Sequence, residues 1–118
     1  MVGDLRISVL NAVGSAVTDA VVCGENHDCV GLLFYPNPTL SRGEIETAVQ
    51  TGLTVFNAHA KGSGGKVARA MVLAEPPDVH AGEITDKGYI AQSLARNHRA
   101  AAVARLFADP APQDVMVF

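Results

Sequence analysis

Two apolar runs separated by a turn decide the fold: Ala20-Val21-Val22-Cys23 and Cys29-Val30-Gly31-Leu32-Leu33-Phe34-Tyr35. Both runs are rich in β-branched or aromatic residues, and Gly24-Glu25-Asn26-His27-Asp28 between them is typical of a turn. We therefore predict a β-hairpin. Its strands are apolar on both faces, and such strands belong to a sheet that is covered by other elements on both sides.

Patterns typical of amphipathic helices lie on either side of this hairpin. Asp4 can cap a first helix, and Ser41 can cap a second one with Glu44 as its capping-box partner. The second pattern continues to Ala60, either as one helix or as two that meet after Gly52. In the first helix, Ile7 and Leu10 lie opposite the apolar face, which indicates a neighbour outside the domain.

The remaining chain predicts one more strand and one long helix. Val67–Ala74 is a third strand, and residues 78–88 form a polar loop. An alanine-rich helix runs from about Ile90 to Phe107, and the tail Asp114–Phe118 is either a short edge strand or disordered. We expect one α+β domain over residues 1–118, with a small three-stranded sheet built on the hairpin and flanked by helices. Its strands are Ala20–Gly24, Cys29–Tyr35 and Val67–Ala74.

Composition narrows the class of protein. The 118 residues are 48% hydrophobic, which supports one packed core, and no apolar run is long enough for a membrane span. A net charge of −3 and 5% aromatic residues disfavour nucleic-acid binding. The two cysteines are too few for a disulfide scaffold and the amino terminus does not resemble a secretory signal, so we expect a cytoplasmic protein.

Three groups of residues are weak candidates for chemistry. Gly62-Ser63-Gly64-Gly65-Lys66 resembles a phosphate loop, but Val67 replaces the hydroxyl residue and a strand follows, so we interpret it as a flexible connection. Cys23, His27 and Cys29 lack the spacing of a zinc site, and two buried thiols are expected instead, with no metal. The other histidines are isolated: His59, His80 and His98.

Two further features carry charge. Arg96, Arg99 and Arg105 give the last helix a basic side, which is either a solvated face or a site for an anion such as a phosphorylated cofactor. In the segment Gly82–Ile90, two glycines allow sharp turns, and Lys87 stands at the apex of a Thr-Asp-Lys-Gly turn.

The most specific block of the chain is Ala81-Gly82-Glu83-Ile84-Thr85-Asp86-Lys87-Gly88-Tyr89-Ile90. More generic blocks are Asp19–Val22 with Gly24, Leu32–Asn37, Val67–Ala70 and Leu73–Pro77. Together these blocks resemble the carboxy-terminal domain of adenylate-forming acyl-CoA synthetases, most closely that of feruloyl-CoA synthases.

The resemblance implies a mobile lid for a large amino-terminal adenylation domain, which would be the main partner. Lys87 would be catalytic in acyl-adenylate formation, and another face of the lid would meet coenzyme A. The other residues of the substrate loop would be Gly82, Glu83, Thr85, Asp86, Gly88 and Tyr89. ATP and coenzyme A would be substrates of the full enzyme, with Mg²⁺ in the adenylation domain. We expect this chain alone to bind none of them and to have no complete ligase activity.

One departure from the superfamily concerns the lysine. The usual motif is Thr, two residues, Gly-Lys and an apolar residue; here Lys87 precedes Gly88, and Tyr89 holds the usual lysine position. Feruloyl-type enzymes share this arrangement. The alternative function is a stand-alone, non-catalytic binding module with the same fold. Because a lid without its partner exposes contact surface, we also predict weak self-association as a dimer.

Overall fold

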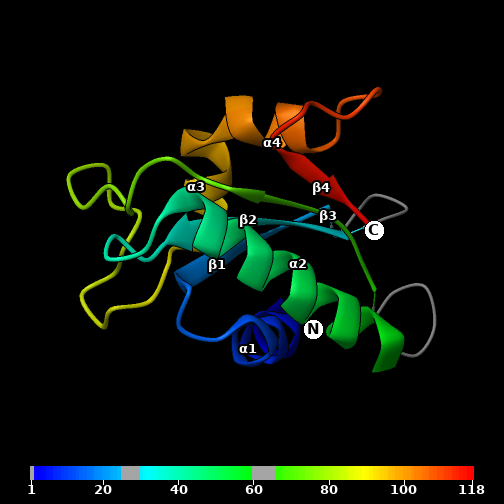
Figure 1. Ribbon diagram of the computed structural model, residues 1–118. Coiled ribbons are helices and arrows are strands. Elements are labelled where there is room, and N and C mark those ends of the chain that lie inside the picture. Colours follow the sequence, from blue (N-terminus) through cyan, green and yellow to red (C-terminus); the bar gives the residue numbers. More distant parts are fainter. Residues whose placement is uncertain (1, 25–29, 60–65) are drawn as a thin grey trace.

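A computed structural model describes residues 2–24, 30–59 and 66–118 of the chain, which form three layers (Figure 1). A central sheet has two helices on one face and two on the other. The elements in chain order are α1 (Val2–Val13), β1 (Val17–Cys23), β2 (Val30–Pro36), α2 (Arg42–His59), β3 (Val67–Val72), α3 (Gln92–His98), α4 (Ala100–Leu106) and β4 (Val115–Val117).

The sheet is mixed and has the order β1-β2-β3-β4 in the described ranges. β1 and β2 pair antiparallel, as the hairpin predicts, although its turn residues 25–29 lie outside those ranges. β2 and β3 pair parallel, and α2 makes the long connection that parallel strands need. The sheet has four strands where three main strands were predicted, because Val115–Val117, in the tail expected to be either a short edge strand or disordered, pairs antiparallel with β3. Three residues give too short a pattern to separate a strand from a tail.

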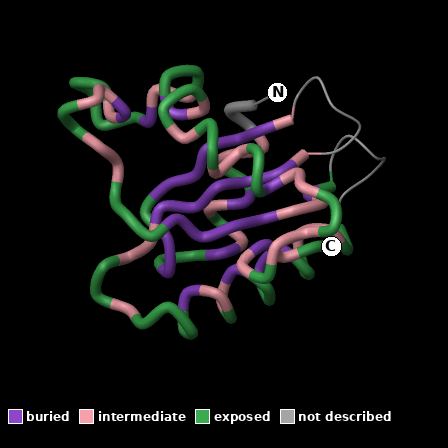
Figure 2. Tube along the Cα trace, turned by 90° about the horizontal axis from the view of Figure 1, so that it is seen from above, coloured by how far each residue is buried: buried purple, intermediate pink, exposed green. Residues whose placement is uncertain are grey.

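Both faces of β1 and β2 are largely buried, which confirms the expected cover on each side. Ala20, Leu32 and Phe34 pack in one apolar cluster with α1 and α2. Their neighbours Leu33 and Tyr35 pack in a second cluster with α3 and α4. The buried strands form the centre of the molecule, with exposed loops and helix surfaces around it (Figure 2).

α2 is a single helix that continues through Gly52, which is one of the two expected alternatives. Two other helices differ from the sequence expectation. α1 already begins at Val2, so Asp4 is not its N-cap residue. The expected helix from Ile90 to Phe107 is instead α3 and α4, interrupted at Arg99, whose φ of −102° and ψ of 30° are not helical. It also begins later, because Ile90 pairs with Ile84 in a β-bridge. None of the helices in the described ranges is long and apolar enough to cross a bilayer.

The side of α1 that carries Ile7 and Leu10 was expected to contact a neighbour outside the domain, but part of it is covered by this domain itself. Leu10 is half-buried and packs against the cluster between α1 and α2, so it belongs to this domain's own core. Ile7 is 54% exposed. The expected external surface on α1 is therefore reduced to Ile7 and its exposed neighbours.

Candidate functional site

The predicted substrate loop forms a small, regular hairpin. Ile84 and Ile90 form an antiparallel bridge at its base. At its tip, the Thr85 amide donates to the Tyr89 carbonyl at 2.7 Å, and the Gly88 amide donates to the Thr85 carbonyl at 2.9 Å. Gly88 has a φ of +84°, the left-handed conformation that follows a type I turn in three-residue hairpin loops. The sequence Asp-Lys-Gly therefore builds the turn that presents Lys87.

Lys87 is exposed at this tip, between Asp86 and Gly88, which are also exposed. Within the ranges that the structure describes, its ammonium group has no hydrogen bond or ion pair. All the arginines of the chain, in contrast, bind groups within the fold: Arg6, Arg42, Arg69, Arg96, Arg99 and Arg105. Lys87 is thus a cation free to meet an external anion.

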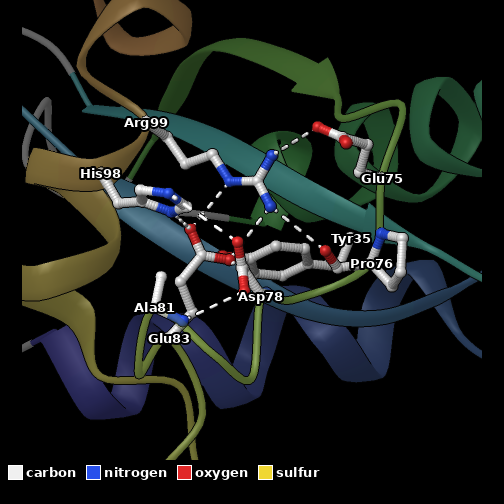
Figure 3. A network of polar contacts seen from close by, with 8 residues as sticks. All are labelled: Tyr35, Glu75, Pro76, Asp78, Ala81, Glu83, His98 and Arg99. Atoms are coloured by element: carbon white, nitrogen blue, oxygen red, sulfur yellow. Dashed lines mark hydrogen bonds and ion pairs between the residues drawn. The ribbon is translucent and has the colours of Figure 1, made fainter.

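Glu83 stands just before the hairpin and behaves differently from the rest of the predicted loop. Its side chain is completely buried, and both carboxylate oxygens accept several hydrogen bonds (Figure 3). Oε1 accepts from the Tyr35 hydroxyl at 3.2 Å and from the Asp78 amide at 2.7 Å. Arg99 holds both oxygens, with Nη2 3.0 Å from Oε1 and Nε 2.8 Å from Oε2. This carboxylate is fully occupied inside the domain.

His98 completes the network from the end of α3. Its Nδ1 lies 2.5 Å from Glu83 Oε2, and its Nε2 lies 3.9 Å from Asp78 Oδ2. The Asp78 side chain in turn accepts from the Ala81 amide at 3.0 Å, which closes the turn before Glu83 (Figure 3). The interruption at Arg99 is therefore where two consecutive residues, His98 and Arg99, both reach one carboxylate.

The electrostatics of this cluster favour an ionised Glu83. Burial alone raises the pKa of a carboxyl group, but hydrogen bonds from Arg99, the Asp78 amide and His98 outweigh it and lower the pKa of Glu83 to about 2. Burial and the adjacent Glu83 carboxylate raise the pKa of Tyr35, so its hydroxyl stays a donor. The Arg99 guanidinium also lies 5.7 Å above the centre of the Tyr35 ring. The cluster is a compact structural ion pair rather than an open binding site.

The basic side predicted for the last helix is only partly solvated, because the Arg105 side chain is 53% exposed and that of Arg99 is 13% exposed. Arg99 is bound to Glu83, and it also donates to the Pro76 carbonyl at 3.1 Å. Arg96 donates to the Val22 carbonyl of β1 at 2.9 Å, and Arg105 pairs with Asp114. All three guanidinium groups join α3 and α4 to the rest of the domain.

The other candidates from the sequence do not gather at the hairpin. Cys23 is buried in the sheet, and burial raises the pKa of its thiol to about 11, while His27 and Cys29 lie outside the described residues. The glycines of Gly62–Gly65 are also outside them. His59 ends α2, and His80 is exposed in the loop before Glu83. In the described parts of the chain, no group of three His, Cys, Asp or Glu residues could hold a metal ion.

One open hollow of about 320 Å³ lies elsewhere, between α2 and the carboxy-terminal segment. Glu46 and Gln50 line it from α2, and Asp114 and Met116 line it from the other side. None of its lining residues belongs to the hairpin that carries Lys87. Sequence reasoning had no signal for this hollow, because it depends on where β4 packs.

Sequence reasoning also missed the network around Glu83. Tyr35 and Glu83 are 48 positions apart, so no local spacing joins them. The available signal was weak, because His98 and Arg99 end a run of four polar residues, Arg96-Asn97-His98-Arg99, and nothing in the sequence distinguishes them from the other two.

Comparison with known proteins identifies the family of this domain. The family model of the AMP-binding enzyme C-terminal domain matches residues 7–111, which include β1, β2 and β3, the Glu83 network and the hairpin. No curated protein and no solved structure matches the chain significantly. The family match covers most of the chain. The chain therefore belongs to the AMP-binding enzyme C-terminal domains, the lid domains of adenylate-forming ligases.

Proposed function

We propose that this domain is the mobile lid of an ATP-dependent acid–CoA ligase of the feruloyl-CoA synthase type, with Lys87 as its catalytic lysine. One observation carries the proposal: in a member of this family, Lys87 is an exposed cation without an internal partner, at the tip of a hydrogen-bonded hairpin. A rigid support under a free charge is the arrangement that electrostatic catalysis needs.

Lys87 would act in the first half-reaction. A carboxylate oxygen of the acid attacks the α-phosphorus of ATP, the new oxygen–phosphorus bond gives the acyl-adenylate, and pyrophosphate leaves. Negative charge gathers on the oxygens around phosphorus in the transition state, and a lysine ammonium held beside them stabilises it. The exposed side chain of Lys87 carries no internal ion pair that would have to break first.

Coenzyme A would enter in the second half-reaction. After the lid rotates, the thiol of coenzyme A attacks the acyl carbonyl of the adenylate, and AMP leaves as the thioester forms. Lys87 has moved away at that stage, so its charge contributes little to the second step. We assign ATP and coenzyme A to the full enzyme and Mg²⁺ to the adenylation domain, and none of them to this chain alone. The described part of the chain offers no metal-ligand cluster.

Lys87 stands two positions before the usual lysine position of the superfamily, but the hairpin brings both positions to the same place. Lys87 lies inside the turn and Tyr89 just after it, and both are exposed at the same tip. A side chain at either position starts from nearly the same end of the hairpin. This geometry supports Lys87 in the role that the superfamily usually gives to the residue at the position of Tyr89.

The main partner would be the adenylation domain of the same enzyme. The test joins this chain to the adenylation domain that precedes it or is encoded beside it, and measures the two half-reactions separately. Lys87→Ala should slow adenylate formation on the order of a hundred- to a thousandfold, while thioester formation from pre-made adenylate changes much less. Lys87→Arg should restore little, because a planar guanidinium does not replace a compact ammonium.

Tyr89→Phe is the matched control, since it changes a side chain at the same tip and removes no charge. It should leave both half-reactions nearly unchanged. Equal losses in both half-reactions for Lys87→Ala would indicate a docking defect, and normal adenylate formation would remove Lys87 from the mechanism. No specific observation favours the alternative of a non-catalytic binding module.

A further inference from the structure

The hairpin that carries Lys87 is attached to the domain at its base. The hydrogen bonds of its tip join Thr85, Gly88 and Tyr89 to one another. Below the tip, Ile84 and Ile90 pack against the cluster under α3 and α4. Glu83 is a further, polar attachment at the base, so the orientation of the hairpin also depends on how firmly this residue is held.

Glu83 is held through both its backbone and its side chain. Its amide donates to the Asp78 carbonyl at 3.0 Å, and its carbonyl accepts from the Ala91 amide at 2.8 Å. Its carboxylate is fixed from the opposite side by His98 and Arg99. The junction of α3 and α4 therefore grips the residue from which the hairpin starts (Figure 3).

We propose that His98 and Arg99 are positioning residues for Lys87: by gripping the Glu83 carboxylate, they set the direction in which the hairpin presents the lysine. The inference rests on the proposed catalytic role of Lys87. Neither residue would touch substrate. Each acts through Glu83, and the loss of either would change the orientation of Lys87 without changing its charge.

The length of the hairpin makes this grip important. Four residue steps separate Glu83 from Lys87, a span of up to roughly 13 Å in extended chain. A rotation of about 10° at the base would then move the tip by about 2 Å. A displacement of even about 1 Å of a catalytic group can cost on the order of a hundredfold in rate. A small rotation of the hairpin at Glu83 therefore causes a larger displacement of Lys87.

His98 is the better residue for a test, because its side chain is 39% exposed and does not fill the core. His98→Leu removes one of the two donors to Glu83 Oε2 and leaves Arg99 Nε as the other. His98→Asn retains both, because the asparagine amide nitrogen takes the place of Nδ1. Arg105→Gln is the matched control on α4. It removes the exposed ion pair between Arg105 and Asp114 and does not affect the contacts of Glu83.

The first measurement uses this chain alone and needs no substrate. Amide hydrogen exchange is followed by NMR at Thr85, Gly88 and Ala91, whose amides are bonded in and below the hairpin, with Leu33 of the central sheet as internal reference. His98→Leu should speed exchange at the three hairpin amides by about tenfold relative to the reference. His98→Asn and Arg105→Gln should stay close to the parent chain.

The second measurement uses the chain joined to its adenylation domain. His98→Leu should lower kcat for adenylate formation by about tenfold or more while the KM for ATP changes little, and His98→Asn should recover most of the loss. Should His98→Leu fail to fold, Arg99→Lys, which keeps the charge but loses the two-pronged grip, gives the same comparison.

Unchanged exchange at the hairpin amides would overturn the proposal, as would equal kinetic losses in His98→Leu and His98→Asn. Faster exchange with normal adenylate formation would also overturn it, because orientation would then not matter for the reaction. The failure of the proposed function is distinguished by Lys87→Ala: normal adenylate formation in that variant rejects the function, while the exchange data on the chain alone still decide whether His98 fixes the hairpin.

Discussion

Gly52 of α2 and Ala12 of α1 lie so close that a Cβ atom on Gly52 would stand 2.7 Å from the Ala12 carbonyl oxygen and 2.9 Å from the Cα atom of Val13. The two helices therefore meet backbone to backbone, closer than side chains on both would allow. This contact explains why a glycine stands in the middle of α2, because only a residue without a side chain lets α1 pack this close.

A substitution at this contact should destabilise the domain. In Gly52→Ala, the added methyl group meets backbone atoms that can move only if the helices separate, so we expect the free energy of unfolding to fall by roughly 1–3 kcal/mol. Urea unfolding followed by circular dichroism measures the change. Gly43→Ala is the control in the first turn of the same helix, where nothing lies within 4 Å of a new Cβ atom. It should be neutral or stabilise by up to about 1 kcal/mol, and equal effects of both substitutions would contradict the packing argument.

The Glu83 network predicts a loss of stability in acid. The pKa of Glu83 is about 2 in the folded chain against an ordinary value of 4.5, so the unfolded chain takes up the proton first as the pH falls. The contribution is complete above about pH 5 and is lost as the pH falls through 4.5 towards 2. Each unit of pKa difference corresponds to about 1.4 kcal/mol, so the loss reaches roughly 3 kcal/mol.

Glu83→Gln separates this contribution from that of the other carboxylates. The variant should be less stable than the parent at pH 7, because Arg99 loses its charged partner, and its free energy of unfolding should fall less steeply between pH 5 and pH 2. Denaturant titrations at a series of pH values give both curves. Parallel curves for the parent and the variant would refute the assignment to Glu83.

β1 is an edge strand whose outer side is covered by side chains of α3. The Gln92 side chain accepts from the Val22 amide at 2.9 Å and donates to the Ala20 carbonyl at 3.0 Å, as a neighbouring strand would. Gln92→Ala should lower the free energy of unfolding by about 1–2 kcal/mol and promote self-association through the open edge. Asn97→Ala, at an exposed position of the same helix, should do neither. Analytical ultracentrifugation and urea unfolding of both variants check this.

The weak dimer expected from the sequence stays a prediction, and Ile7 gives a way to test it. Ile7 and Val55 are each 54% exposed, on α1 and α2 respectively. Ile7→Ser should reduce concentration-dependent association in sedimentation velocity while stability changes by less than about 0.5 kcal/mol. Val55→Ser should leave association unchanged. A parent chain that remains monomeric at high concentration would reject the prediction.

Local patterns were sufficient for much of the fold. The capping box at the start of α2 forms as predicted, with the Glu44 amide 3.2 Å from Ser41 Oγ and the Ser41 amide 3.1 Å from Glu44 Oε1. The antiparallel pairing of β1 with β2 and the cover on both faces also followed from residue types alone. In each case the interacting residues are close in the chain, or a whole strand repeats the same signal.

Features that depend on distant partners could not be predicted. β4 is a strand because Arg69–Met71 lies beside it, and α3 ends where Arg99 reaches Glu83, 16 positions away. The sequence placed Glu83 in the substrate loop with Lys87 and gave no reason to separate the two. Lys87 is exposed, in keeping with its predicted place at the apex of a turn. Only the fold shows that Glu83 is completely buried and bound by Tyr35, His98 and Arg99.

The positions of the two tyrosines have an optical consequence. The chain contains no tryptophan, so Tyr35 and Tyr89 dominate its near-ultraviolet absorbance and fluorescence. Tyr35 is buried under a guanidinium group beside a carboxylate, whereas Tyr89 is 59% exposed and stands two residues from Lys87. One chromophore therefore reports on the interior and the other on the hairpin tip. Closure of the tip onto a partner can be followed by the emission of Tyr89 without an attached dye, and Tyr89→Phe supplies the spectrum of Tyr35 for subtraction.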